Sequence, residues 1–318
     1  MPFGERILVT GGAGFIGSAF VRRVIDGNEV VVLDTFSRDA LARWPGLREH
    51  PHLTVRVGSV TDPEAVEAAL DGATMVVHCA AVAGIDSVGV RPARTMEVNL
   101  LGTWHVLEAA RQVGGLRRFV DFSTSEVFGT HAWRVSESDP AVIPPPGEPR
   151  WTYAASKLAA EHLTHAFHRE HGLPVTSLRP FNVYGPRQVG EGAVHHFIQR
   201  ALQGGPVRVY NDGAQVRAWL YVDDAVDAVC RACVRPAAVG EAFNLGNPDA
   251  AITVWDLAQR VARLVGGDIP VVRVPRPGPD VELRLPVVDK ARRLLGFEPR
   301  WGLSEGLRST IAWYRGQA

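Results

Sequence analysis

Several features that mark other classes of protein are missing from this 318-residue sequence. It contains only three cysteines, an odd and small number for a disulfide framework. No basic stretch with an apolar core and a cleavage site precedes the first apolar segment at Ile7, so we expect no secretory signal. The longest apolar run, residues 73–85, contains His78 and falls short of the ~20 residues that cross a bilayer. These absences favour a cytoplasmic protein without a membrane span.

Charge of neither sign is in excess. The chain carries 34 Lys and Arg residues against 34 Asp and Glu residues, and the two signs are interspersed. Nucleic acids and anionic membranes are bound by clustered positive charge, so we expect neither as a partner. With 46% hydrophobic residues, the chain can bury a large core. We therefore expect a globular protein that acts on a small molecule.

A metal site is not expected either. Cys230 and Cys233 form a single CxxC within a helical pattern, and no second pair completes a zinc site, so we interpret both as buried apolar residues. Four histidines recur every three residues on a predicted helix, at His162, His165, His168 and His171. Because a three-residue step drifts by ~60° around a 3.6-residue helix, we interpret them as a solvated or subunit-facing edge.

Strand-like and helix-like segments alternate from the first residues onward. Such alternation predicts an α/β fold with a Rossmann-type, doubly wound parallel sheet. The expected strands are near-continuous apolar runs, as in a sheet covered on both faces. They span residues 6–10, 29–34, 53–57, 74–78, 117–123 and 174–179. The expected long helices span residues 15–26, 94–113 and 153–171.

The length and spacing of the predicted elements change after Pro180. Shorter helices are expected at residues 194–202, 254–264 and 303–314. We therefore predict a dinucleotide-binding domain at residues 1–180 and a smaller, mixed α/β substrate lobe at residues 181–318, with part of residues 215–245 returning to the first domain. Two proline-rich segments, residues 139–149 and 270–286, are expected to be loops without central strands.

A glycine-rich loop follows the first strand and opens the first helix. Gly12, Gly14 and Gly17 satisfy GxGxxG, and Gly11 replaces Gly12 in the related GxxGxxG pattern. Such a backbone can approach a pyrophosphate and direct the amides of a helix N-terminus at it. Asp34 ends the second strand, where its carboxylate can accept hydrogen bonds from a ribose diol and would repel a 2′-phosphate. The pattern favours NAD over NADP, although Arg38 lies close by.

A tyrosine and a lysine four residues apart suggest base catalysis. Tyr153 and Lys157 share one face of a predicted helix. A neighbouring ammonium favours ionisation of the phenol, which can then take a proton from a sugar hydroxyl while the carbon hydride leaves for NAD. Thr124 lies at the end of a preceding strand, where ligands bind in doubly wound folds. These three residues are the candidate catalytic set.

Together these motifs resemble the extended short-chain dehydrogenase/reductases, a family of NAD-dependent nucleotide-sugar epimerases and dehydratases. The resemblance covers essentially the whole chain and includes TGGAGFIG, HCAA, STSEVFG, YAASK, RPFNVYGP and RAWLYVDD in order. It implies a catalytic triad of Thr124, Tyr153 and Lys157, with Glu126 as a further catalytic candidate. The implied NAD-binding residues are Gly11, Gly14, Phe15, Ile16, Gly17, Asp34, Ser37, Ser59, Val60, Ala80, Ala81, Asn99, Ser123, Tyr153, Lys157 and Pro180.

The resemblance also implies a nucleotide-sugar substrate and a homodimer. The implied substrate-binding residues are Thr124, Ser125, Asn182, Val194, Val209, Arg217, Arg276 and Asp280. Members of the family commonly pair through two helices as a four-helix bundle, here residues 94–113 and 153–171. The chain departs from the family at Ser59, where many members have an aspartate.

The reactions of this family begin with oxidation, usually at carbon 4 of the sugar. Epimerisation at carbon 4 needs little beyond the triad, and we favour it. Glu126 follows the catalytic threonine, as in the dehydratases and decarboxylases, so 4,6-dehydration or decarboxylation of a uronate stays open. A non-catalytic NAD-binding regulator is a further alternative, and the complete triad argues against it.

Overall fold

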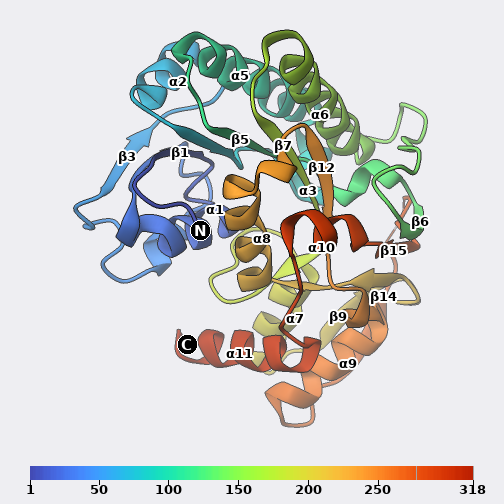
Figure 1. Cartoon of the computed structure of the whole chain (residues 1–318). Coiled ribbons are helices and arrows are strands. Elements are labelled where there is room, and N and C mark those ends of the chain that lie inside the picture. The colour runs from blue at the N-terminus through green and yellow to red at the C-terminus, as the bar shows by residue number, and fades with distance from the viewer. Residues whose placement is uncertain (277, 318) are drawn as a thin grey trace.

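The computed structural model describes residues 1–276 and 278–317, and its centre is a seven-stranded parallel sheet with the order β12-β7-β5-β4-β1-β2-β3 (Figure 1). This confirms the predicted doubly wound fold. The strands are β1 (Arg6–Thr10), β2 (Glu29–Asp34), β3 (Leu53–Val57), β4 (Met75–His78), β5 (Arg118–Phe122), β7 (Val175–Pro180) and β12 (Glu241–Leu245).

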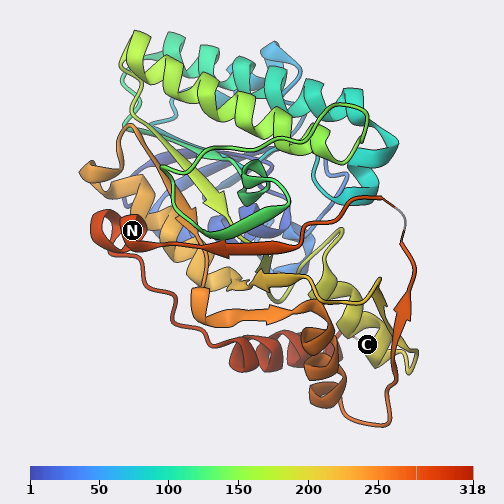
Figure 2. The same cartoon turned by 90° about the vertical axis from the view of Figure 1, so that its right-hand side faces the viewer.

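Helices cover both faces of this sheet. One face is covered by α1 (Phe15–Val24) and α8 (Val222–Val234). The other is covered by α2 (Pro63–Leu70), α5 (Gly102–Val113) and α6 (Trp151–His171), and Figure 2 shows α5 and α6 lying side by side. Alternate residues of β2 pack into two different hydrophobic clusters, Val30 and Val32 with α1, and Val31 and Leu33 with α2. Burial on both faces explains the near-continuous apolar runs.

Two of the expected long helices differ from the prediction in detail. The helix expected at residues 15–26 ends at Val24, and a 3₁₀ turn (Ile25–Gly27) follows. The helix expected at residues 94–113 consists of α4 (Pro92–Met96), a π-helical turn (Glu97–Leu101) and α5. Hydrophobic periodicity does not distinguish an α-helix from one that contains a single wider turn.

A smaller group of elements lies at the carboxyl end of the large sheet (Figure 1). It contains α7 (Ala193–Leu202), α9 (Val254–Val265) and α11 (Leu303–Arg315), with α10 (Asp289–Leu295) nearer the large sheet. Two parallel pairs are β8 (Val183–Tyr184) with β11 (Leu220–Tyr221), and β9 (Val207–Tyr210) with β14 (Val271–Val274). A four-stranded sheet has the order β13 (Ala251–Thr253), β10 (Val216–Ala218), β15 (Leu283–Pro286) and β6 (His131–Val135).

The expectation of a loop at residues 270–286 is wrong in part. This segment forms β14 and β15, and β15 lies in the interior of the four-stranded sheet. Proline is tolerated because Pro286 is the last residue of β15, at a point where the register with β6 is irregular. The other proline-rich segment, residues 139–149, forms no strand or helix, as expected.

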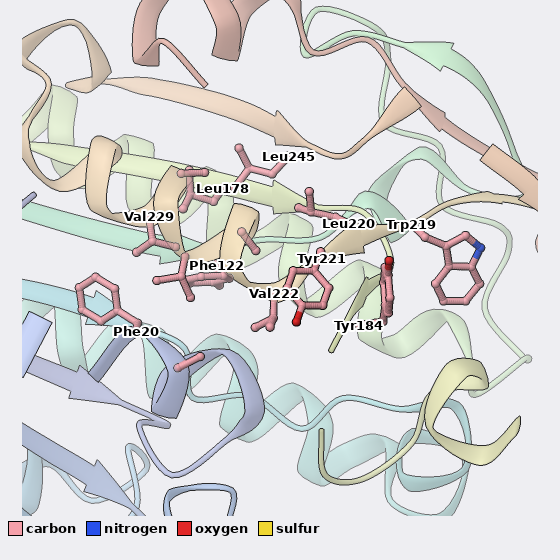
Figure 3. Close-up of a cluster of buried hydrophobic side chains, with 14 of the residues drawn as sticks. Phe20, Phe122, Leu178, Tyr184, Trp219, Leu220, Tyr221, Val222, Val229 and Leu245 are labelled. Atoms are coloured by element: carbon pink, nitrogen blue, oxygen red, sulfur yellow. The ribbon is translucent and has the colours of Figure 1, made fainter. Parts of the chain in front are cut away.

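A single hydrophobic cluster joins the smaller lobe to the large sheet. Figure 3 shows Phe20 of α1 and Val229 of α8 beneath the sheet, and Tyr184 and Tyr221 on the side of the smaller lobe. Cys230 and Cys233 are buried in the same cluster, which confirms their apolar role. In the described residues, no helix is both long and apolar enough to cross a membrane.

Candidate active site

A cavity of about 350 Å³ opens at the carboxyl ends of β1, β4, β5 and β7. It is formed by the glycine-rich loop on one side and by residues of β5, α6 and the smaller lobe on the other. It brings together many of the residues singled out from the sequence, which are Gly11, Gly14, Phe15, Ile16, Gly17, Ala81, Ser123, Thr124, Ser125, Glu126, Tyr153, Lys157, Pro180 and Asn182.

The glycine-rich loop leaves an open cradle at the N-terminus of α1. Gly11 has a φ of +68°, and a Cβ there would lie 2.6 Å from the backbone nitrogen of Ala80. A Cβ on Gly17 would lie 2.4 Å from the carbonyl oxygen of Gly11. Gly14 precedes α1 and no side chain caps the helix, so its first amides are free to bind an anion. This arrangement fits a pyrophosphate.

We expect Gly17→Ala to displace this loop and weaken NAD binding by roughly tenfold or more, because overpacking of this kind costs ~1–3 kcal/mol. The NAD content of the purified protein and its affinity by calorimetry measure the effect. Gly302→Ala is the matched control, since nothing lies within 4 Å of a Cβ there. Equal NAD affinity in the two variants would contradict a close approach of the loop to the cofactor.

Asp34 is held at the edge of the cradle by two backbone amides. Ala13 donates to its Oδ2 at 2.9 Å and Phe36 to its Oδ1 at 2.8 Å. Burial raises the pKa of Asp34, and these hydrogen bonds oppose the rise. Arg38 points elsewhere, because its guanidinium hydrogen-bonds to Ser87 at 2.9 Å and pairs with Glu191 at 3.3 Å. The arrangement favours a ribose diol over a 2′-phosphate.

Other residues expected to hold the cofactor lie outside the cavity lining. Asn99, in the π-helical turn, is fully buried, and its amide exchanges hydrogen bonds of 2.8 and 3.1 Å with the backbone of Val82 and donates to Ser156 at 3.0 Å. Val60 is buried against Gly102. Through Val82, Asn99 holds the segment that contains the lining residues Ala81 and Ala83. Ser37 is exposed, Ser59 hydrogen-bonds to Thr61, and Ala80 lies directly behind Gly11.

The three candidate catalytic residues converge on the cavity. Tyr153 and Lys157 lie one turn apart on α6, and Thr124 follows β5 and caps a short 3₁₀ turn by accepting from the Glu126 amide at 3.2 Å. Burial raises the pKa of Tyr153 to about 12, and hydrogen bonding with Thr124 acts in the opposite direction. Tyr153 therefore needs further positive charge to act as a base near neutral pH.

Lys157 is placed to supply such charge. The residue is 1% exposed, and its Nζ has no hydrogen-bond partner in the part of the chain that the structure describes. A buried ammonium without partners is costly, so a ligand that supplies acceptors is expected to bind there. The ribose of a dinucleotide offers hydroxyl oxygens of this kind.

Charged side chains surround the substrate end of the cavity. Arg284 of β15 forms an ion pair with Glu126, and Arg217 and Arg150 lie nearby, 3.6 and 3.1 Å from Asp280. Burial acts to raise the pKa of Glu126, but Arg284 and the other two arginines outweigh it and the pKa is lowered. Burial lowers the pKa of Arg217 to about 9. Glu126 is therefore ionised and tied to a cation.

Several residues expected to bind substrate are placed differently. Val194 and Val209 are 1% and 0% exposed in the hydrophobic core, and neither lines this cavity. Apolar residues on amphipathic elements of the smaller lobe pack inward. The family resemblance alone does not distinguish a core residue from one that contacts substrate. Arg276 pairs with Asp86 at 2.8 Å outside the cavity lining. Asp280 lies outside the lining too and serves as a partner of the arginines.

Sequence reasoning missed two charged residues of the cavity, Arg284 and Glu191. Arg284 comes from the segment expected to be a loop. Glu191 accepts hydrogen bonds from the Ser87 hydroxyl and from the backbone of Asp86 and Ser87, at 2.6, 2.8 and 3.0 Å. Neither residue belongs to a short motif, so only the folded chain reveals them.

Comparison with known proteins places this site in a family. Residues 7–246 match the model of the NAD dependent epimerase/dehydratase family. The chain belongs to this family. It is therefore an enzyme that uses NAD, and the glycine cradle, Asp34 and the unpartnered Lys157 fit that cofactor.

Relatives of the chain within the epimerase/dehydratase family catalyse different reactions. The chain is 37% identical to dTDP-glucose 4,6-dehydratase of Streptomyces niveus, over 98% of this chain and 93% of the relative. It is 35% identical to UDP-glucuronic acid decarboxylase 5 of Arabidopsis thaliana, over 95% and 87%. A UDP-glucuronic acid 4-epimerase from Bacillus cereus, solved with UDP-glucuronic acid and NAD, superposes with a TM-score of 0.88 at 28% identity, over 98% and 100%.

Proposed function

We propose that this enzyme removes the carboxylate of a nucleotide-linked uronic acid after transient oxidation at carbon 4. The proposal rests on one observation, the incomplete hydrogen bonding of the buried Arg284 guanidinium. This side chain is 4% exposed and pairs with Glu126 through Nη1, whereas Nε and Nη2 have no partner among the described residues. A guanidinium with two free donors suits a second carboxylate, and a uronate provides one.

The residues of the site can be assigned to steps of this reaction. NAD, when bound, accepts the carbon-4 hydride reversibly. Tyr153 takes the carbon-4 hydroxyl proton, Thr124 orients that hydroxyl, and Lys157 favours the tyrosinate. The resulting ketone is β to the carboxylate, so loss of carbon dioxide leaves its electron pair on the sugar as an enolate. Three transfers complete the balance: a solvent proton to carbon 5, the hydride back to carbon 4, and the proton from Tyr153 back to the carbon-4 oxygen.

The geometry gives less support to 4,6-dehydration. That reaction needs an acid for the departing carbon-6 hydroxide as well as a base at carbon 5. Glu126 is ionised and paired with Arg284, and Ser125 offers a buried hydroxyl in the adjacent position. Neither is an acid near neutral pH. The sequence-based preference for carbon-4 epimerisation remains the second candidate, because a triad suffices for it and an arginine can also hold a uronate that is epimerised.

A panel of UDP-, dTDP- and GDP-linked sugars, each as the neutral hexose and as its uronate, separates these reactions. In deuterated water, decarboxylation releases carbon dioxide and places deuterium at carbon 5. Dehydration gives deuterium there without carbon dioxide, and epimerisation gives neither. In every case NAD is regenerated. Turnover of neutral hexoses alone would reject the proposal.

We also propose a homodimer, which the outer surface of α5 and the preceding turn supports. Leu101 and Trp104 are 52% and 46% exposed there, although large apolar side chains are usually buried. Light scattering should give twice the mass of one chain, and Trp104→Glu should shift the distribution toward monomer. Trp133→Glu, at another exposed tryptophan, is the control and should leave the mass unchanged. A wild-type monomer at working concentration would reject the dimer.

The three free thiols fit the reducing cytoplasm, which we keep as the proposed location.

A further inference from the structure

A row of buried polar side chains crosses the large sheet beside the candidate active site. In the parallel register, Thr10 lies next to His78, His78 next to Asp121, and Asp121 next to Ser177. All four are fully buried. Neighbours in register share a face of the sheet, and His78 contacts Thr103 of α5, so this face is the one that α5 and α6 cover. The row therefore lies between the sheet and the helix that carries Tyr153 and Lys157.

Asp121 is the member of this row that combines a charge with a lack of hydrogen bonds, since Ser177 is also unpartnered but neutral. Neither of its carboxylate oxygens has a hydrogen-bond partner in the described chain. His78 is satisfied on both sides, by Thr10 at 2.6 Å and Thr103 at 3.0 Å, and burial lowers its pKa to about 3, so it is neutral. An unpaired buried carboxylate costs free energy, and nothing in the sheet itself offsets that cost.

Lys157, on the helix that covers this face of the sheet, is the unsatisfied charge of opposite sign. No hydrogen bond joins it to Asp121, but the ammonium acts across the intervening space, since burial raises the pKa of Asp121 to about 6 and Lys157 opposes the rise. Glu161 of α6 also faces Asp121, and Arg179 neutralises it through hydrogen bonds of 2.6, 3.0 and 3.1 Å. Asp121 and Lys157 remain as a separate pair of opposite charges.

We propose that Asp121 is a positioning residue that balances the charge of Lys157 beneath the cofactor, and thereby tunes both the release of the Tyr153 proton and the preference of the site for NAD⁺ over NADH. Asp121 acts through its electric field and touches no reacting atom. The proposal rests on the roles given above to Tyr153 and Lys157. It concerns the oxidation step alone and holds whichever reaction follows.

The sign of each effect follows from the charge of Asp121. An ionised carboxylate holds the proton of Tyr153 more tightly and so raises the pKa of that phenol. It also attracts the positive nicotinamide ring of NAD⁺, a charge that NADH lacks. Removing the carboxylate therefore makes Tyr153 easier to deprotonate and makes NAD⁺ bind less well relative to NADH.

Asp121→Asn tests the proposal, because the amide keeps the size of the side chain and removes its charge. We expect this variant to fold. Folding raises the pKa of Asp121, so its contribution to stability is largest when it is protonated and is lost as the pH rises through about 6. The asparagine variant is then at least as stable at neutral pH. Ser177→Ala, the neighbour in register that is also buried and unpartnered, is the matched control.

Competition binding of NAD⁺ and NADH is the first measurement. In Asp121→Asn the affinity for NAD⁺ relative to NADH should fall by roughly threefold to tenfold, as expected for one charge acting at an effective dielectric constant near 20. Ser177→Ala should leave the ratio unchanged. A ratio that stays at the wild-type value in both variants would overturn the proposal.

The pH profile of kcat/KM is the second measurement. The acid limb should move to lower pH by roughly one unit in Asp121→Asn. The difference from the wild type should vanish below about pH 6, where Asp121 itself is protonated. A loss of activity that is uniform across pH would show a structural role and reject the proposal. In Asp121→Asn, the ratio of the affinities for NAD⁺ and NADH could change while the acid limb of kcat/KM stays in place. That result would support the charge balance at the cofactor and reject Tyr153 as the base.

Discussion

Tyr153→Phe should lower turnover by roughly 10²–10⁴-fold, the range that a positioned acid or base contributes, while the protein keeps its fold and its NAD. The change removes only the hydroxyl that carries the carbon-4 proton, and the ring still fills its place on α6. Its neighbours Thr124 and Lys157 stay in position and cannot replace it, since the ammonium has no lone pair to accept a proton. Steady-state rates with the preferred nucleotide sugar, together with NAD content, give the result.

Tyr221→Phe is a closely matched control for this experiment. Burial raises the pKa of Tyr221 to about 12, as it does for Tyr153, but Tyr221 hydrogen-bonds to Ser309 at 2.9 Å and lies outside the cavity lining. We expect it to retain most of the wild-type rate. Substantial activity in Tyr153→Phe would exclude Tyr153 as the base, whichever sugar is turned over.

Arg284→Met should reduce kcat/KM for the uronate by roughly 10²-fold or more, because truncating one partner of a buried charge pair costs 2–5 kcal/mol. A neutral hexose presents no carboxylate to Arg284 and should lose much less. The measurement is the ratio of kcat/KM for the two substrates in the wild type and the variant. An equal loss for both would assign Arg284 a structural role and leave the uronate proposal without its support.

Removing Arg284 also leaves Glu126 buried without its partner, which would destabilise the protein. The double variant Arg284→Met/Glu126→Gln removes both charges and should recover stability without recovering the uronate reaction. Glu126→Gln alone keeps the positive charge of Arg284 and should retain more activity than Arg284→Met. A severe loss in Glu126→Gln, with deuterium at carbon 5 and no carbon dioxide, would point to dehydration.

The parts of the fold that the sequence predicts are those set by local pattern. The apolar runs identify six of the seven strands of the large sheet to within a residue or two, because most of these strands are buried on both faces, although the edge strand β3 is largely exposed. The glycine-rich loop identifies the cradle, because only residues without a Cβ fit where Gly11 and Gly17 approach neighbouring backbone. The spacing of Tyr153 and Lys157 places them one helical turn apart, and the structure does the same.

The parts that the sequence does not reveal depend on contacts between distant segments. Glu126 and Arg284 are separated by 158 residues, and they meet because β15 pairs with β6 in a small sheet. No alternation of apolar and polar residues in the sequence indicated this sheet. Asp121 looks like one polar residue in an apolar strand. Its significance depends on the register that sets it beside His78 and on the helix that brings Lys157 over it. Register and helix placement are tertiary properties.

The position of β12 has a consequence for how the chain matures as it is synthesised. This strand pairs with β7 at the edge of the large sheet, and α8 packs against α1, yet both follow the first elements of the smaller lobe in the chain. A nascent chain of 180 residues would leave the edge of β7 unpaired and the apolar side of α1, including Phe20, uncovered. The glycine-rich loop that forms the NAD cradle is therefore synthesised early. The large sheet and the helices that pack on it are complete only after Leu245 has left the ribosome.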